Sequence, residues 1–399
     1  MHRLPRFTAI LVGIVFLSAL AHGVPTATLS AEVPKLVVST IDDRYLFADS
    51  NPTWKVARGR ILAAKDSTRD AMYAHIASEL ATLRDSELHL VSPEEAAAID
   101  REGKGAALGI GLIDFGIDVV PETGEARVVT PLIGSPSSNA GVRSGDVIVS
   151  VNGRATSRLD HEQVCDAVRQ KSADLVLRRG SQTLHLHLES SATPLSAVVA
   201  EAKPAGEPTL AYIRIAQFTP DSGELVRAQV QKFEAAHPRG YILDLRNNPG
   251  GFVSAAATVA RTFASGPLGA KVRRNGAVEP ITNNSAPLTS VPLVVLVNEG
   301  TASAAEFVAG ALQDLHRATL IGAPTYGRGQ AQIFLPLADG YGLIIPSALL
   351  ATSSGRRFKG TGLQPDERIP SKPLLEADLA TSRDAQFQRA VEILVKPKV

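Results

Sequence analysis

Ser303 is placed where a serine hydroxyl can act as a nucleophile. The apolar run 291–297 predicts a buried strand, and residues 303–315 predict a helix with one apolar face. The small-residue turn between them would put the Ser303 hydroxyl at a helix N-terminus, where the helix dipole and free N–H groups favour developing negative charge. Serine is also an ordinary helix N-cap, which is the simpler explanation if this turn is considered alone.

A glycine turn follows another predicted strand, residues 241–245. The segment 247–251 reads Asn-Asn-Pro-Gly-Gly. Its Pro-Gly-Gly end can present backbone N–H groups without obstruction by a Cβ atom, as the stabilisation of an oxyanion requires. We expect the neighbouring Asp244 and Arg246 to stabilise this turn rather than to take part in chemistry.

The elements that must position both turns form an alternating pattern. Strands and helices alternate from residue 209 onward, which predicts an α/β layered core. The predicted strands are 210–215, 241–245, 291–297, 319–321 and 343–345, and the predicted helices are 222–235, 252–264 and 303–315. Upstream, residues 54–84 have apolar positions at helical spacing. Residues 22–53, with three prolines, are predicted to be a loosely structured lead-in.

Residues 105–190 read differently, as short β segments separated by glycine turns. The loop Leu108-Gly109-Ile110-Gly111 could receive a peptide C-terminal carboxylate on its backbone N–H groups, while the adjacent strand edge pairs with the peptide backbone. Any tight turn favours glycine, so this loop alone is weak evidence. Two histidines at 185 and 187 share a strand face, but no third ligand is apparent, and we expect no metal site.

The N-terminus and the composition limit the class of protein. Residues 1–21 combine a basic start, an apolar stretch and an A-x-A ending, which predicts a secretory signal peptide cleaved after Ala21; an uncleaved N-terminal membrane anchor is the alternative. With 41 Lys+Arg, 40 Asp+Glu and 44% apolar residues, the chain gives no reason to expect nucleic-acid binding or global disorder. Its single cysteine, Cys165, excludes an internal disulfide framework.

Several segments resemble those of the C-terminal processing (tail-specific) peptidases, peptidase family S41, which are serine proteases with a Ser-Lys dyad and an embedded PDZ domain. The resembling motifs are DLRNNPGG at 244–251, NEGTASAAE at 298–306 and, for the PDZ domain, residues 128–153. The resemblance implies an α/β (α+β) fold, with a crotonase/ClpP-like layered protease core, a β-rich PDZ domain and an N-terminal helical segment. The expected divisions are 1–21 signal peptide, 22–104 lead-in and helical segment, 105–190 PDZ domain, 191–370 peptidase core and 371–399 C-terminal helix and tail.

The resemblance also implies roles for individual residues. Ser303 corresponds to the nucleophile, Gln332 to the glutamine that assists the base, and the N–H groups of Gly251 and Ala304 to the oxyanion donors, with Gly250 as an alternative donor. The base, a lysine in the family, is here Arg328. Arginine has a pKa of roughly 12.5–13.8, so it cannot take the serine proton near neutral pH. It could instead fix a carboxylate or stabilise an oxyanion.

Another residue could therefore supply the base. In the tricorn-like branch of this superfamily a histidine upstream of the PDZ domain has that role. The usual position of that histidine is Glu87 here, and His89 lies two residues beyond, facing the same way if the stretch is extended. His89 is the alternative base, although an ordinary surface histidine is the simpler explanation. Lys359 and His316 are further candidates.

Together these features predict an exported serine peptidase, periplasmic or extracellular in a bacterium, that cleaves proteins recognised through their C-terminal region. It would need no metal or organic cofactor, and Arg328 would reduce its activity or require another base. The alternative is a catalytically inactive relative that binds peptide C-termini as an adaptor or scaffold. A crotonase-like acyl-processing enzyme shares the expected core but is disfavoured, because a PDZ domain indicates peptide ligands.

Overall fold

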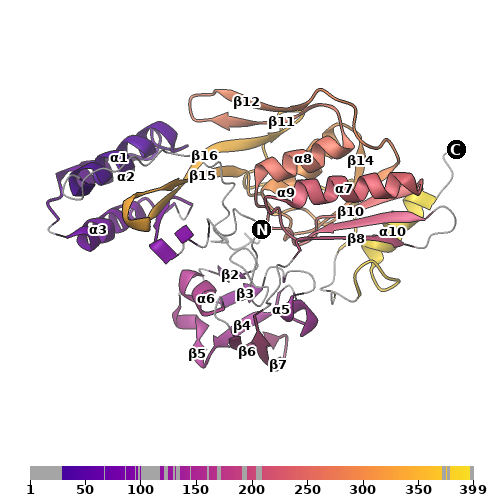
Figure 1. Cartoon of the computed structure of the whole chain (residues 1–399), viewed down its shortest axis with the longest axis horizontal. Helices are drawn as coiled ribbons and strands as arrows, with labels where there is room; N and C mark the ends of the chain where they lie inside the picture. Colours follow the sequence, from indigo (N-terminus) through magenta and orange to yellow (C-terminus); the bar gives the residue numbers. More distant parts are fainter. Residues whose placement is uncertain are drawn as a thin grey trace.

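The computed structural model of the chain (Figure 1) describes residues 29–395, apart from single positions and short internal segments. The positions not described within that span are 67, 86, 95, 98, 100–116, 121–124, 129–130, 132–134, 144, 160, 169–171, 191–195, 204–208, 371–373 and 375–377. Two predicted features, the signal peptide at 1–21 and the carboxylate-binding loop Leu108, Gly109, Ile110 and Gly111, therefore lie outside the described residues.

A six-stranded sheet forms the centre of the core. Its order is β17-β14-β13-β10-β9-β8, and all neighbours are parallel except β8, which is antiparallel to β9. The strands are β8 (Val198–Lys203), β9 (Leu210–Ile215), β10 (Gly240–Asp244), β13 (Leu293–Val297), β14 (Ala318–Gly322) and β17 (Glu367–Arg368). Because parallel strands end at the same edge, the turns after β10 and β13 lie side by side.

Helices cover both faces of this sheet, as side-chain alternation along the strands requires. Ile213, Leu243 and Val295 face a cluster formed with α7 (Ser222–Ala235), α8 (Val253–Phe263) and α9 (Ala304–Asp314). The intervening strand residues face α10 (Ala385–Val395). This two-sided burial explains why the central strands are continuous apolar runs. The predicted helices and strands of the core match the structure to within a few residues, except the last predicted strand (343–345), which is the much longer β16 (Gly342–Thr352).

A second sheet packs against the outer side of α8 and α9. It contains β11 (Gly266–Arg273), β12 (Val278–Asn283), β15 (Gln330–Pro336), β16 (Gly342–Thr352) and the short β1 (His89–Val91). The long strand β16 pairs antiparallel with β1, β11 and β15. It thereby joins the core to the segment that immediately follows the N-terminal helices (Figure 1).

Three N-terminal helices pack on the distal ends of β15 and β16 (Figure 1): α1 (Leu29–Arg44), α2 (Pro52–Ala63) and α3 (Arg69–Ala81). The prediction of a loosely structured lead-in over 22–53 is wrong for α1. Its apolar residues Val33, Val37 and Ile41 recur every four positions and are buried. Pro34 lies inside this helix, where it removes one backbone hydrogen bond, so tertiary burial outweighs the proline.

The residues between 117 and 190 that the structure describes form a separate small sheet, of order β2-β3-β4-β6-β7, with its own apolar core. Its elements are β2 (Ile117–Val120), β3 (Glu125–Val128), α5 (Pro136–Asn139), β4 (Val147–Val151), β5 (Arg154–Ala155), α6 (His161–Val168), β6 (Ser172–Arg179) and β7 (Gln182–Glu189). On β7, His187 is exposed and contacts Asp174 and Glu189. This is the solvated strand face expected for the two histidines.

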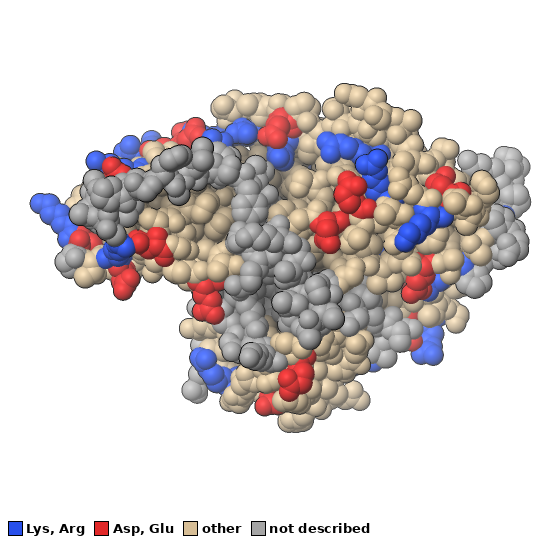
Figure 2. Space-filling model, viewed as in Figure 1, with Lys and Arg blue, Asp and Glu red and all other residues tan. Residues whose placement is uncertain are grey.

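Charge is spread evenly over the part of the surface that can be seen. Acidic and basic side chains are interspersed over the described part of the face in Figure 2. This distribution agrees with the net charge of +1. Among the helices that the structure describes, none combines the length and apolarity needed to cross a bilayer.

Candidate active site

Ser303 occupies the turn between β13 and α9 in a strained conformation. Its φ of 54° and ψ of −118° are unusual for a residue other than glycine. Such backbone costs roughly 1–3 kcal/mol and persists only where its surroundings enforce it. Two hydrogen bonds from the preceding residues hold this turn against the segment that follows β10. The Ala302 N–H donates to the Asn248 carbonyl (2.9 Å), and the Thr301 hydroxyl donates to the Leu245 carbonyl (2.8 Å). Strain of this kind at a strand-to-helix turn is typical of catalytic nucleophiles.

The glycine loop lies directly beside this turn. Asn247 and Asn298 exchange two hydrogen bonds of 2.8 Å, which tie the loop after β10 to the turn after β13. Gly251 has a φ of 126°, and a Cβ atom there would lie 2.2 Å from the Phe218 carbonyl oxygen, so only glycine fits. The Gly250 N–H already donates to Asn248 Oδ1 (2.8 Å). The arrangement thus favours Gly251 over Gly250 as a donor to a bound oxyanion.

The N–H of Ala304 belongs to the first residue of α9, one of the N–H groups that have no acceptor within the helix. Ala304 is fully buried, and the helix dipole at this end favours negative charge. Two backbone donors from different elements, Gly251 and Ala304, therefore flank the Ser303 turn. Two such donors are what stabilisation of an oxyanion requires.

A buried carboxylate, Glu306, connects this turn to the segment that contains Arg328. Its Oε2 accepts from the N–H of Ser303 (2.9 Å) and of Arg328 (2.8 Å). Its Oε1 accepts from the Thr325 hydroxyl (2.5 Å) and the Gly327 N–H (2.7 Å). Burial raises the pKa of Glu306 to about 7, although these four donors oppose the shift. Glu306 thus fixes the position of the Arg328 segment relative to Ser303.

Replacing Glu306 with glutamine should change how stability depends on pH. Because the pKa of Glu306 is raised to about 7 in the folded chain, from 4.5, folding favours its protonated form. The resulting contribution of Glu306 to the free energy of unfolding is fully present below about pH 4.5 and is lost as pH rises to about 7. Relative to Glu306→Gln, the wild type should therefore lose free energy of unfolding over this interval. Urea unfolding at several pH values measures it, and a pH-independent difference would contradict the assignment.

Arg328 points into a cluster of charged and polar side chains contributed by distant segments. Its side chain is only 6% exposed, and its Nε lies 3.7 Å from Oε1 of Glu87. The Gln332 amide nitrogen lies 3.4 Å from the other oxygen of Glu87. The Arg328 guanidinium also stands over the Tyr326 ring, at 5.5 Å from its centroid. The structure therefore brings two of the predicted site residues, Arg328 and Gln332, together around Glu87.

The remaining candidate bases, His89, His316 and Lys359, lie in three different parts of the chain. His89 is the first residue of β1, opposite Ile344 of β16, whereas His316 lies between α9 and β14. Lys359 is adjacent to Gly329, and its amine lies 4.3 Å from the centroid of the Phe47 ring. Burial lowers the pKa of Lys359, and Glu87 opposes that shift. Among the described residues, no group of three or more His, Cys, Asp and Glu side chains could hold a metal ion.

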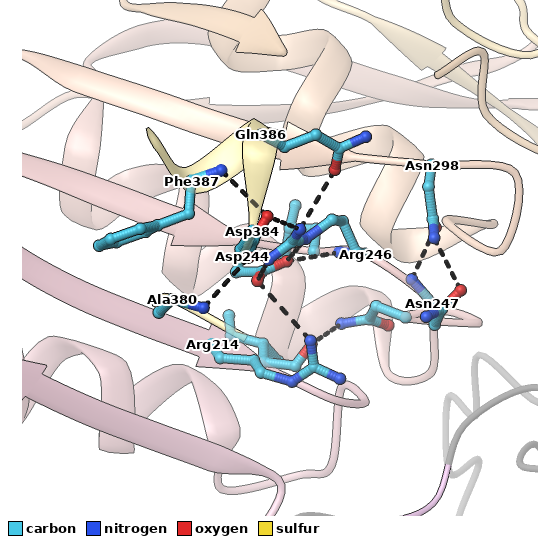
Figure 3. A network of polar contacts seen from close by, with 12 residues as sticks. Arg214, Asp244, Arg246, Asn247, Asn298, Ala380, Asp384, Gln386 and Phe387 are labelled. Atoms are coloured by element: carbon cyan, nitrogen blue, oxygen red, sulfur yellow. Dashed lines mark hydrogen bonds and ion pairs between the residues drawn. The ribbon is translucent and has the colours of Figure 1, made fainter. Parts of the chain in front are cut away.

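Behind the glycine loop a buried ion-pair network connects the central sheet to the C-terminal helix (Figure 3). Arg246 donates to both oxygens of Asp244 (2.9 and 2.5 Å) and to both oxygens of Asp384 (2.8 and 2.7 Å). Burial opposes ionisation of Asp244, but Arg246 and Arg214 outweigh it and lower the pKa of Asp244 to about 2. Asp244 and Arg246 thus bond to each other directly before the turn that carries Gly250 and Gly251.

Three residues of this site were not predicted from the sequence. Glu306 has a local signal, because Ser303 and Glu306 have the Ser-x-x-Glu spacing of a capping box. For Glu87 the only sequence signal is its position, where a related branch has histidine. Asp384 has no local signal, since its partner Arg246 is 138 residues away.

Comparisons with known proteins agree with this geometry. The family model described as peptidase family S41 matches residues 209–369, and a PDZ domain model matches residues 127–179. A carboxyl-terminal-processing protease of Synechocystis sp. is 33% identical over 384 residues, which cover 93% of this chain and 88% of that protein. A carboxy-terminal processing protease of Bacillus subtilis is 30% identical over 298 residues, 71% of this chain and 62% of that protein.

Superposition on a solved structure supports the same fold assignment. The photosystem II D1 C-terminal processing protease superposes with a TM-score of 0.71 at 29% identity, covering 87% of this chain and 94% of that one. The family resemblance, the α/β class and the presence of a PDZ domain are thereby confirmed.

Proposed function

We propose a reaction for this chain, which belongs to the C-terminal processing proteases of peptidase family S41. The reaction is hydrolysis of peptide bonds in proteins recognised through their C-terminal region, with an acyl-enzyme formed on Ser303. The observation that carries the proposal is the strained Ser303 turn at the N-terminus of α9, held against a glycine loop whose Gly251 admits no side chain.

The chemistry follows from the positions of these groups. The Ser303 hydroxyl attacks the scissile carbonyl and loses its proton, and the N–H groups of Gly251 and Ala304 stabilise the resulting oxyanion. Collapse of this intermediate breaks the C–N bond, and the leaving amine takes up the proton. A water molecule then attacks the acyl-enzyme, releases the new C-terminus and restores Ser303.

Recognition and location complete the proposal. The PDZ domain would bind the free C-terminus of a protein or peptide substrate, with Leu108, Gly109, Ile110 and Gly111 as the carboxylate-binding loop. Residues 1–21 would direct export to the periplasm or the cell exterior, with the membrane involved only if the N-terminus is retained as an anchor.

One experiment separates this proposal from the inactive-receptor alternative, which Arg328 favours because arginine cannot act as the base. The mature chain from residue 22 is incubated with a fluorophosphonate probe, and the adduct is located by mass spectrometry. In parallel, hydrolysis of an unfolded model protein is compared with hydrolysis of the same protein blocked at its C-terminus by amidation. We expect an adduct on Ser303 and slower cleavage of the amidated substrate.

The contrary outcome is equally specific. No adduct and no hydrolysis, with the free C-terminal peptide still bound, would mean that the chain is a receptor rather than an enzyme.

A further inference from the structure

Two buried carboxylates contact the segments around Ser303, and they differ in how fully their oxygens are occupied by hydrogen bonds. Glu306 accepts from four donors: the N–H groups of Ser303, Gly327 and Arg328 and the Thr325 hydroxyl. A carboxylate has about four lone-pair sites, so these donors saturate it. Glu306 therefore positions the site, and its contact with Ser303 is to the backbone N–H rather than to the hydroxyl.

The second carboxylate, Glu87, is held more loosely. Its hydrogen bond from Gln332 is long, at 3.4 Å, and its ion pair with Arg328 spans 3.7 Å. Both contacts leave lone-pair sites unused, because an ideal Arg–carboxylate pair would occupy both oxygens at under 3 Å. The Glu87 side chain is 17% exposed, enough for contact with water.

Arg328 connects Glu87 to the Ser303 turn. The backbone N–H groups of Ser303 and Arg328 share one acceptor, Glu306 Oε2, so these two residues are close neighbours. From that point the buried Arg328 side chain extends to Glu87. Glu87 thus lies beside the guanidinium of Arg328, the residue at the position of a base that arginine itself cannot supply.

We propose that Glu87 is the proton acceptor for Ser303, directly or across one water molecule. This inference rests on the proposed function. In acylation the Ser303 O–H bond breaks as the O–C bond to the substrate forms, and the proton moves to a Glu87 oxygen; it passes to the leaving amine as the C–N bond breaks. In deacylation Glu87 takes a proton from the attacking water and returns it to Ser303. Arg328 stays protonated throughout and holds the carboxylate in place.

The charges around Glu87 determine the pH at which it can work. Burial raises the pKa of Glu87, Asp85 raises it further, and Arg328, Lys359 and the Gln332 amide lower it. The net pKa is raised, so the carboxylate gains a proton at a higher pH than an ordinary glutamate, and hydrolysis should decline as pH falls through that value. A lysine base loses its proton at a higher pH than a glutamate, so the acidic limb of a lysine-dependent reaction would lie at higher pH.

The test is a pH profile of kcat/KM for the wild type and four variants. Glu87→Gln should reduce the rate by about 10²–10⁴-fold, the usual contribution of a general base. Arg328→Lys combined with Glu87→Gln should restore hydrolysis, with the acidic limb moved to higher pH. His89→Gln should keep most of the activity. The matched control Asp85→Asn removes a neighbouring charge that raises the pKa of Glu87, so it should keep most of the maximal rate while its acidic limb moves to lower pH. Thermal unfolding of each variant checks that it folds.

Several outcomes would overturn the assignment. Unchanged hydrolysis in Glu87→Gln, or a loss confined to His89→Gln, would place the base elsewhere. If the acidic limb of the kcat/KM profile lies at the same pH in the wild type and the double variant, it does not report Glu87. It then belongs to Glu306, which both the wild type and the double variant retain. Hydrolysis by the double variant but not by the wild type would refute Glu87 while leaving the peptidase chemistry intact. Hydrolysis by neither would refute the proposed function as well.

Discussion

Replacing Ser303 with alanine should lower kcat/KM for protein hydrolysis by at least about 10³-fold. The variant keeps the oxyanion donors and the PDZ domain but has no atom that can form an acyl bond. Only the residual rate from binding and electrostatic stabilisation would remain. Binding of a free C-terminal peptide should be unchanged, because the substitution lies in the core and not in the PDZ domain. Steady-state kinetics and peptide titration measure the two effects separately.

A second buried serine provides a matched control. Ser222 also lies at a helix N-terminus, at the start of α7, and its hydroxyl donates to the Thr219 carbonyl (2.8 Å). Ser222→Ala should cost about 1 kcal/mol of stability, as loss of one hydrogen bond does, without affecting hydrolysis or probe labelling. Equal loss of activity in both variants would indicate that Ser303 acts only on stability.

Replacing Asp384 with alanine should destabilise the protein by about 3–5 kcal/mol, the cost of removing one partner of a buried ion pair. Asp384 is 1% exposed and accepts two hydrogen bonds from Arg246 and others from the N–H groups of Ala380 and Phe387. Without it, the buried Arg246 guanidinium keeps only the partners on its Asp244 side and Gln386. Urea unfolding measures the change.

The same region contains a control for this prediction. Asp378 pairs with Arg383 at 2.6 Å, and the Arg383 side chain is 76% exposed. Asp378→Ala should cost no more than about 1 kcal/mol, as expected for an exposed ion pair. A similarly small loss in Asp384→Ala would show that the C-terminal helix is held by its apolar contacts and not by the charge network.

Hydrolysis should fall together with stability in Asp384→Ala. Arg246 directly precedes the Asn247–Gly251 loop, so its guanidinium and the oxyanion donor share one short segment. Activity that survives at temperatures where the variant remains folded would show that the loop is positioned by its contacts with Asn298 and Phe218 alone.

The core of the fold could be predicted from the sequence because buried strands and helices there have recognisable patterns of apolar residues. The strands β9, β10 and β13 are buried on both faces and read as apolar runs, whereas α7 and α9 bury one face and show helical spacing. The prediction failed for α1, because its proline and polar residues obscure an apolar stripe that is buried against α2, α3 and β16.

The sequence by itself determined the class of protein and the candidate nucleophile. The turns that carry Ser303 and Gly251 are contiguous segments, so the residue types and the backbone they require are both visible in the chain. Only the tertiary structure decided how the site is completed. Glu87 meets Gln332 across 245 residues, Asp384 meets Arg246 across 138, and Glu306 joins two loops through four hydrogen bonds. Such contacts depend on which strand ends are neighbours, and sheet order is a property of the packed fold that no local spacing encodes.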